Sequence, residues 1–423
     1  MIRIYEKKQW ESEDILKRRN EVPDVSEEVS QIIKKVREGG DRAIFECERK
    51  RHPRPYLESL QVSDREFDEA FAALPGELLD TMKRAAANIE EFHKRQLCEG
   101  FSYERPDGSI LGQRVMPIEK VGLYIPGGSA SYPSSILMNA IPARIAGCSE
   151  IIMTSPSDKE GRMSPLILAS AKLAGVTKLF KTGGAQAIAA MAYGTESIPK
   201  VYKITGPGNA YVAEAKRQVF GTVAIDMIAG PSEVLIISDG KSDPDLLAAD
   251  LLSQAEHDKA ATAVLITLSR AEAEAVRDRI EDRLKKLLRE DIARASVDSN
   301  GKILIAESIG EAAALSNELA PEHLEISTDD PFECLKLIKN AGSIFLGRET
   351  CEPLGDYFAG PNHTLPTMGT AKFSSALSVD DFVKRSQFLC YSSKAFRRDA
   401  EDIIRFAEAE GLTGHAEAVR ARL

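Results

Sequence analysis

Several features that mark large classes of protein are scarce or missing in this sequence of 423 residues. It has one tryptophan, and its longest apolar runs fall far short of the roughly 20 residues that a membrane-spanning helix needs. Acidic residues outnumber basic ones by 65 to 55, and the net charge of −10 disfavours contact with nucleic acid or an anionic membrane. We therefore expect a soluble protein that binds neither.

Cysteine is also scarce, and no secretory signal is visible. The six cysteines are widely scattered with no CxxC pair, so we expect reduced thiols and no sulfur-bound metal. The first residues, MIRIYEKKQWESED, are charged from the third position on and lack the apolar core of a signal peptide. These absences predict a cytoplasmic protein.

Short β-type runs alternate with alanine-rich helical segments from Val121 onward. EIIMTS, TKLFKTG and KVYKITG are such runs in a first block, and EVLIISD, ATAVLITL and KILIAES repeat the pattern in a second. Helical spacing dominates before this region, as in Val29, Ile33 and Val36, and returns after Gly369. We predict an α/β fold with two Rossmann-like doubly wound domains, a helical N-terminal segment and a small helical C-terminal tail domain.

The length of the chain also indicates more than one domain, because single cores stop growing beyond about 250 residues. Changes of pattern along the chain suggest the boundaries. The predicted parts are a helical segment over 1–20, a discontinuous α/β domain over 21–115 and 236–368, a Rossmann-like α/β domain over 116–235, and a helical tail over 369–423.

Glycine-rich turns suggest a ligand in the first block, although the usual dinucleotide motif GxGxxG is absent. Three such turns, Gly122–Gly128, Gly183–Gln186 and Gly206–Asn209, each follow a predicted strand and precede a predicted helix. Turns of this kind let backbone approach a phosphate at a helix N-terminus, but they also serve as plain chain reversals. The turns are therefore compatible with a nucleotide, with a sugar phosphate or with no ligand.

Four of the six histidines have polar companions at spacings that suit a metal or catalytic site. Gln254 and His257 are three residues apart on a predicted helix, so both can reach one cation. Glu322 and His323 stand in a proline-marked turn before a strand, and serve one site only if the turn redirects them.

The other two of these four histidines lie in a loop and near the end of the chain. Asp356 and His363 flank a glycine-rich loop, and His415 lies close to the last residue. Imidazole, carboxylate and amide ligands suit zinc or a similar divalent ion, although each of these histidines is also typical of a structural residue. His52 and His93 lie in charged helical surroundings and indicate no site.

Eight segments, in order from Val121 to Val419, resemble the histidinol dehydrogenase family. Several long blocks in sequence are more specific than any single motif, and the helical N-terminal region also fits. The matching segments are VGLYIPGG, GGAQAIAA, GPGNAYVAEAKRQVFG, IDMIAGPSEVLII, LLSQAEHD, APEHLEI, GDYFAGPNHTLPT and EGLTGHAEAV.

The resemblance implies zinc-dependent oxidation of L-histidinol, through L-histidinal, to L-histidine with two NAD, the last step of histidine biosynthesis. It places NAD on the 116–235 domain and the metal and catalytic residues on the discontinuous domain. The residues carried over are Gln254, His257, Asp356 and His415 for zinc; Glu322 and His323 for catalysis; Ser232 and Glu410, with the zinc ligands and the catalytic pair, for substrate; and Tyr124, Gln186 and Asn209 for NAD. His363 is given a supporting place.

The implied mechanism divides the chemistry between two neighbouring residues. His323 accepts the alcohol proton as hydride leaves for NAD, and Glu322 deprotonates the water that attacks the aldehyde. A cysteine thiohemiacetal is the other route from aldehyde to acid, and Cys148 is the one candidate for it, with packing as its alternative role.

The resemblance also implies a homodimer in which the tail crosses over, so that Glu410 and His415 complete the partner's site. A tail that packs on its own protomer is equally compatible with the sequence. A related zinc and NAD alcohol dehydrogenase acting on another polyhydroxy or sulfonated alcohol is one alternative function, and a noncatalytic metal- or nucleotide-binding protein is another. Glu410, His415 and the GPSE segment favour histidinol, and the intact Glu322 and His323 favour an enzyme.

Overall fold

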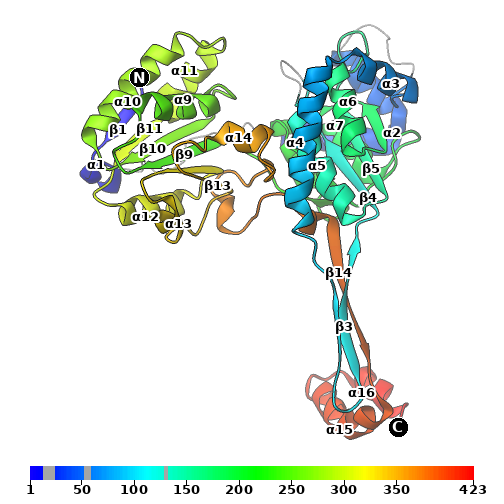
Figure 1. Cartoon of the computed structure of the whole chain (residues 1–423). Helices are drawn as coiled ribbons and strands as arrows, with labels where there is room; N and C mark the ends of the chain where they lie inside the picture. Colours follow the sequence, from blue (N-terminus) through cyan, green and yellow to red (C-terminus); the bar gives the residue numbers. More distant parts are fainter. Residues whose placement is uncertain (13–23, 52–58, 128–131) are drawn as a thin grey trace. The chain divides into compact units, whose positions relative to one another are not determined.

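The fold is mixed α/β and divides into two compact units. The computed structural model describes residues 1–12, 24–51, 59–127 and 132–423 (Figure 1). The first unit comprises residues 1–96 and 119–382, and the second comprises 97–118 and 383–423. No helix within these described ranges combines the length and the apolar character needed to cross a membrane.

The first unit contains a six-stranded, fully parallel sheet in the order β1-β11-β10-β9-β12-β13 (Figure 1). From β9 onward the strands follow the 3-2-1-4-5 order of a doubly wound fold, with β1 added at one edge. In sequence order, the strands are β1 Arg3–Tyr5, β9 Glu233–Ser238, β10 Thr262–Thr267, β11 Lys302–Ile305, β12 His323–Ser327 and β13 Ser343–Leu346.

A second parallel sheet in the same unit has five strands in the order β6-β5-β4-β7-β8, which is again 3-2-1-4-5. In the six-stranded sheet, the central strand β9, EVLIIS, is buried along its whole length, as expected where helices cover both faces of a parallel sheet. The predicted pair of doubly wound sheets is confirmed. The strands of the five-stranded sheet are β4 Lys120–Tyr124, β5 Glu150–Ser155, β6 Lys178–Lys181, β7 Lys203–Thr205 and β8 Ala224–Ile225.

Helices connect the strands of both sheets, and many begin at a residue whose side chain caps the first turn. Ser269, Ser308 and Asp243 each accept a hydrogen bond from a backbone N–H in that turn. The helices are α5 Pro133–Ala146, α6 Pro165–Ala174, α7 Gly184–Tyr193, α8 Ala210–Val219, α9 Pro244–Ala255, α10 Arg270–Leu284, α11 Glu290–Asn300, α12 Ile309–Leu319, α13 Pro331–Leu335 and α14 Glu352–Tyr357.

The start of the chain differs from the helical segment predicted over 1–20. Strand β1 pairs with β11, with Arg3 opposite Lys302, before the short helix α1, Lys7–Ser12. The indole of Trp10 donates a hydrogen bond to the Ile305 carbonyl, 3.1 Å away. A strand of only three residues has too little periodicity to be recognised from sequence. Residues 13–20 lie outside the described ranges.

The sequence predicted that the helices of 21–115 share a domain with 236–368, but they pack mainly against the helices of the five-stranded sheet. Val29 and Ile33 of α2 share a core with Ile188 of α7 and Val212 of α8. Amphipathic spacing predicts that a helix buries one face, but it does not say which sheet provides the partner. These helices are α2 Ser26–Arg51, α3 Asp64–Ala73 and α4 Gly76–Lys94.

The second unit is a three-stranded antiparallel sheet in the order β14-β3-β2, followed by two helices. The tail over 369–423 is therefore not purely helical, because β14 runs through it and residues 369–382 belong to the first unit. Polar residues exposed along β14 give no alternation for a prediction to use. The elements are β2 Phe101–Glu104, β3 Ile110–Pro117, β14 Val383–Cys390, α15 Ser393–Ala409 and α16 Thr413–Arg420.

A buried ion pair holds the loop after β7 in place. Lys216 and Asp226 are 2% and 1% exposed and contact each other directly. The Lys216 ammonium donates to the Gly206 carbonyl at 3.0 Å, and the Gly206 N–H donates to Asp226 Oδ2 at 2.8 Å. One buried pair thereby satisfies both backbone groups of a single glycine.

Lys216→Met should lower the free energy of unfolding by about 3–5 kcal/mol, because it leaves the Asp226 carboxylate buried without a counter-charge. Urea unfolding followed by circular dichroism measures this loss, and adding Asp226→Asn should recover part of it. Lys241→Met, which breaks an exposed pair with Asp329, is the control and should cost less than about 1 kcal/mol. Equal losses from the two lysine variants would contradict this account.

Candidate active site

Two predicted catalytic residues meet at the amino edge of the six-stranded sheet, where β12 begins beside β9. The Glu233 N–H donates to Glu322 Oε2 at 2.8 Å, and His323 Nδ1 lies 3.0 Å from the Glu233 carbonyl. The turn therefore directs both side chains to the backbone of one residue. A carbonyl can only accept, so Nδ1 carries hydrogen, and in a neutral imidazole Nε2 keeps its lone pair.

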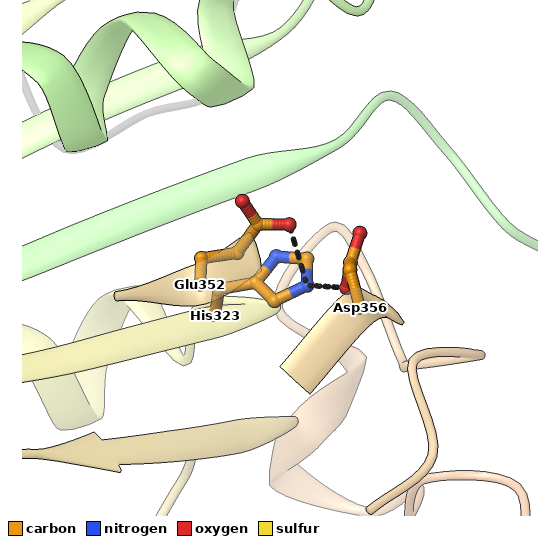
Figure 2. Close-up of side chains that lie close together, drawn as sticks. All are labelled: His323, Glu352 and Asp356. Carbon is orange, nitrogen blue, oxygen red and sulfur yellow. Dashed lines mark ion pairs between the residues drawn. The ribbon is translucent and has the colours of Figure 1, made fainter. Parts of the chain in front are cut away.

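Two carboxyl groups from α14 face His323 Nε2 (Figure 2). Asp356 Oδ1 is 3.6 Å away and Glu352 Oε1 is 4.0 Å away, both too far for a hydrogen bond. Glu352 and Asp356 are four residues apart and share one face of the helix. Glu352 was not among the residues predicted from the sequence, although the two acids of EPLGD are four residues apart, a spacing that places them on one face of a helix.

Three buried atoms at this site have lone pairs but no hydrogen-bond partner in the part of the chain that the structure describes: His323 Nε2, Asp356 Oδ1 and Gln254 Oε1. A polar atom left in this state costs about 1–3 kcal/mol. Ligand atoms of His323, Glu352 and Asp356 all lie within 4.8 Å of one another. An imidazole nitrogen and carboxylate oxygens grouped in this way suit a divalent cation, so the residues fit a bound metal ion.

The helix that precedes β10 adds the predicted amide and imidazole ligands. Gln254 of α9 is buried, and the hydroxyl of its neighbour Ser253 donates to Glu352 Oε2 at 3.3 Å. His257 follows the end of α9, is exposed to solvent, and is close enough to Asp356 for the carboxylate charge to act on it. Helix α14, which carries Asp356, is thus tied to α9.

Burial and charge shift the protonation of the central groups strongly. Burial raises the pKa of Glu322 to about 7, although the charge of His323 opposes this shift. Burial alone would lower the pKa of His323, but the carboxylates of Glu322, Asp356 and Glu352 raise it to about 10. His323 and His363 hold the pKa of Asp356 below its usual range despite burial. This cluster of acids therefore attracts positive charge.

His363 supports the site by holding Asp356. Its Nδ1 lies 3.0 Å from the Asp356 carbonyl and 3.7 Å from Asp356 Oδ1. His93 is a buried structural residue whose Nδ1 lies 2.9 Å from the Ile89 carbonyl, and Asn362 lies 3.2 Å from its Nε2. His52 lies outside the described residues.

The other predicted substrate and metal residues lie further along the chain. Ser232 is half-buried directly before β9, and its carbonyl accepts a hydrogen bond from the Thr262 N–H at 3.0 Å. Glu410, at the end of α15, and His415, in α16, belong to the second unit, and both are exposed. They are not members of the cluster that the first unit forms around His323.

The predicted nucleotide residues gather at the carboxyl edge of the five-stranded sheet, where the strand order reverses between β4 and β7. Tyr124 ends β4, and its hydroxyl accepts a hydrogen bond from the Gly184 N–H at 3.1 Å. Gly206 has φ +113°, and a Cβ there would lie 2.1 Å from the Tyr124 carbonyl oxygen. Only glycine allows the two strand ends to approach so closely.

The side chains of Gln186 and Asn209 are oriented by neighbouring groups. Gln186 is buried and donates to Glu48 Oε1 of α2 at 3.1 Å. Asn209 caps α8, and its Oδ1 accepts the Val212 N–H at 3.2 Å, which leaves its amide N–H₂ available to a ligand. Each glycine-rich turn joins a strand to a helix as predicted, although Gly128 lies outside the described residues.

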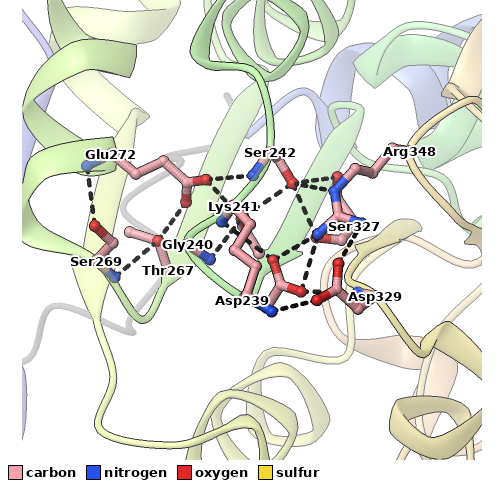
Figure 3. Close-up of polar contacts among 11 residues, drawn as sticks. Asp239, Gly240, Lys241, Ser242, Thr267, Ser269, Glu272, Ser327, Asp329 and Arg348 are labelled. Atoms are coloured by element: carbon pink, nitrogen blue, oxygen red, sulfur yellow. Dashed lines mark hydrogen bonds and ion pairs between the residues drawn. The ribbon is translucent and has the colours of Figure 1, made fainter.

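The equivalent edge of the six-stranded sheet is closed by its own side chains, as Figure 3 shows. Arg348 donates to both oxygens of Asp239 at 2.8 and 2.9 Å, and the Ser242 hydroxyl lies 2.8 Å from that of Ser327. Glu272 accepts hydrogen bonds from the Ser242 N–H and the Ser238 hydroxyl, each 2.9 Å long. This network occupies the position where a doubly wound sheet usually binds its ligand.

Cys148 lacks the properties of a nucleophile. Its thiol is half-buried and lies 3.8 Å from the Phe382 carbonyl, and burial raises its pKa to about 12. The residue precedes β5, at the edge of the sheet opposite Tyr124. A protonated thiol is a poor nucleophile, so the packing role accounts for this residue better.

Comparisons with known proteins agree over nearly the whole chain. The family model for histidinol dehydrogenase matches residues 16–423. The histidinol dehydrogenase of Geobacillus kaustophilus is 52% identical over 395 residues, covering 93% of each chain, and that of Chlorobaculum tepidum is 50% identical over 402 residues, covering 95% of this chain and 94% of the other.

A solved structure agrees equally well. The crystal structure of histidinol dehydrogenase from Elizabethkingia anophelis superimposes with a TM-score of 0.94 at 38% identity, and covers 100% of this chain and 98% of that one. Agreement of sequence and fold over this length shows that the chain belongs to the histidinol dehydrogenase family.

Proposed function

We propose that this chain oxidises L-histidinol through L-histidinal to L-histidine, with two NAD and a bound zinc ion, as the last step of histidine biosynthesis. The observation that carries the proposal is the buried Glu322 and His323 pair, together with the unpartnered ligand oxygens of Gln254 and Asp356. We place the reaction in the cytoplasm, where thiols such as the six free cysteines stay reduced.

In this proposal Gln254, His257 and Asp356 hold zinc, together with His415 from a second copy of the chain. Zinc, when bound, supplies a positive charge that orients the amino alcohol. Asp356 is suited to this role because its pKa is held low and it stays ionised. Ser232 and Glu410 contact the substrate, and the negative charge of Glu410 suits a cationic one.

His323 takes the proton in the first oxidation. Its Nδ1 is committed to the Glu233 carbonyl, so the free lone pair of the neutral ring is on Nε2, which accepts the alcohol proton as carbon loses hydride to NAD. A cation held by Asp356 would lower the pKa of His323 from its high value. The ring could then enter the reaction neutral. The product of this step is the aldehyde.

Glu322 takes the proton in the second oxidation. A carboxyl group with a pKa of about 7 is ionised often enough near neutrality to remove a proton from the water that adds to the aldehyde. The hydrated carbon then loses a second hydride to a second NAD, and the acid forms. Tyr124, Gln186 and Asn209 bind NAD, with Glu48 holding the Gln186 amide in place.

A homodimer with shared sites is the assembly that suits the second unit. Strands β2 and β14 are almost fully exposed and β3 is mostly half-buried, and a small sheet needs an apolar face or another surface packed on it to be stable by itself. Large apolar side chains are also exposed there, including Phe101, Leu389 and Phe406 at 58%, 72% and 71%. A second copy of the chain would cover them and would bring Glu410 and His415 to the first unit of its partner.

His323→Ala should lower kcat for histidinol by roughly 10² to 10⁴, because the proton acceptor is lost. NADH absorbance measures the rate, and product analysis should find two NADH per histidine in the unaltered protein. Cys148→Ser is the control and should keep kcat within about twofold, since its thiol stays protonated. Rapid turnover of another alcohol without turnover of histidinol would refute the assignment.

Oxidation of added L-histidinal should slow as the pH falls through about 7, because protonation of Glu322 removes the base. Glu322→Gln should lower this rate by about 10² to 10⁴ and abolish that acid limb. The kcat–pH profile with histidinal checks both effects. An unchanged acid limb in the glutamine variant would assign the base to another residue.

Mixing a His415→Ala chain with a His257→Ala chain should restore about a quarter of the activity if each site uses both protomers, because half of the dimers are mixed and each has one intact site. Activity after dissociation and reassociation measures the recovery. Mixed dimers confirmed by differential tags but devoid of activity would show that each protomer completes its own site.

A further inference from the structure

Three elements that build the site also carry a second set of acids, two of them buried and one half-buried. Helix and strand periodicity place each acid on the same face as a residue of the site, four apart on a helix and two apart on a strand. The pairs are Asp250 with Gln254 on α9, Glu325 with His323 on β12, and Glu352 with Asp356 on α14. We call Asp250, Glu325 and Glu352 the carboxyl tier.

Contacts within the carboxyl tier connect all three elements. Glu325 Oε1 accepts the Glu352 N–H at 2.8 Å, which joins β12 to the first turn of α14. The carboxyl groups of Asp250 and Glu325 lie close enough for each to shift the pKa of the other, which brings α9 against β12. A third contact joins α9 to α14, where the Ser253 hydroxyl donates to Glu352 Oε2 at 3.3 Å.

The contact between Asp250 and Glu325 requires a shared proton, because two carboxylates only repel each other. Glu325 and Glu352 are 4% and 2% exposed, and Asp250 is half-buried, so water screens the charges poorly. Burial raises the pKa of Asp250 and of Glu325, and the charge of Asp250 raises that of Glu325 further. One acid therefore donates and the other accepts.

We propose that Asp250 and Glu325 are positioning residues that hold α9, β12 and α14 together, so that the Gln254 and Asp356 oxygens meet at one cation. The proposal rests on the zinc-dependent function inferred above. The contact of Asp250 with Glu325 holds α9 against β12, and Glu325, by accepting the Glu352 N–H, holds the helix that carries Asp356. Neither residue touches the metal in this account.

The test compares three variants of the full-length chain. Asp250→Asn keeps a donor for the Glu325 carboxylate, Asp250→Ala removes the contact, and Asp245→Ala is a matched control, since Asp245 is on the same helix and pairs with Arg283. Zinc affinity is measured by competition with a chelating dye, and ligand geometry by the visible spectrum of the Co²⁺-substituted protein.

Asp250→Ala should weaken zinc binding by about 10- to 100-fold, as loss of groups that orient metal ligands does, and should alter the Co²⁺ spectrum. Asp250→Asn and Asp245→Ala should keep both properties close to those of the unaltered chain. If Asp250→Ala does not fold, Ser253→Ala, which removes the tie to Glu352 together with a hydrogen bond to the Asp250 carbonyl within α9, should still weaken zinc binding measurably.

Unchanged zinc affinity and Co²⁺ spectrum in Asp250→Ala, or in Ser253→Ala if that variant has to replace it, would overturn the proposal. A loss in Asp250→Asn as large as that in Asp250→Ala would do so too, because the amide preserves the hydrogen bond. If the unaltered chain binds no zinc, the proposed function fails and this inference fails with it. Normal zinc binding and histidinol oxidation in the unaltered chain, with no effect of Asp250→Ala, would overturn the inference alone.

Discussion

Buried negative charge is the constraint on which the site depends. Glu322, Glu352 and Asp356 face one imidazole in a region where water is excluded, and carboxylates in such a place need positive partners. His323 supplies one positive charge when protonated, and the unpartnered atoms of Gln254 and Asp356 indicate where a cation would supply more. The protonation states that the chemistry requires therefore follow from the charge of this buried cluster.

The two parallel sheets share one strand order but use opposite edges. The six-stranded sheet presents Glu322 and His323 at its amino edge, while the Arg348 and Asp239 pair closes its carboxyl edge. The five-stranded sheet keeps its carboxyl edge for Tyr124 and the glycine turns. Equal topology does not give equal function, because side chains at each strand end decide whether a ligand can enter.

Several parts of the fold were predictable because they repeat along the sequence. Parallel strands buried on both faces read as continuous apolar runs, so both sheets were recognised. The partner of α2 could not be predicted, because an apolar helix face fits many surfaces. β14 was missed because its exposed polar residues resemble a loop or helix, and Glu352 because it lies outside the segments that suggested the site.

The sequence by itself determined the family, the doubly wound topology and the residue types of the proposed catalytic pair, since these depend on local order along the chain. Only the tertiary structure decided that both Glu322 and His323 bond to Glu233, that Glu352 faces His323, and that Glu325 accepts the Glu352 N–H. The physical reason is that pKa shifts and unpartnered atoms arise from burial among distant segments. Spacing along a chain contains no information on how deeply a group is buried.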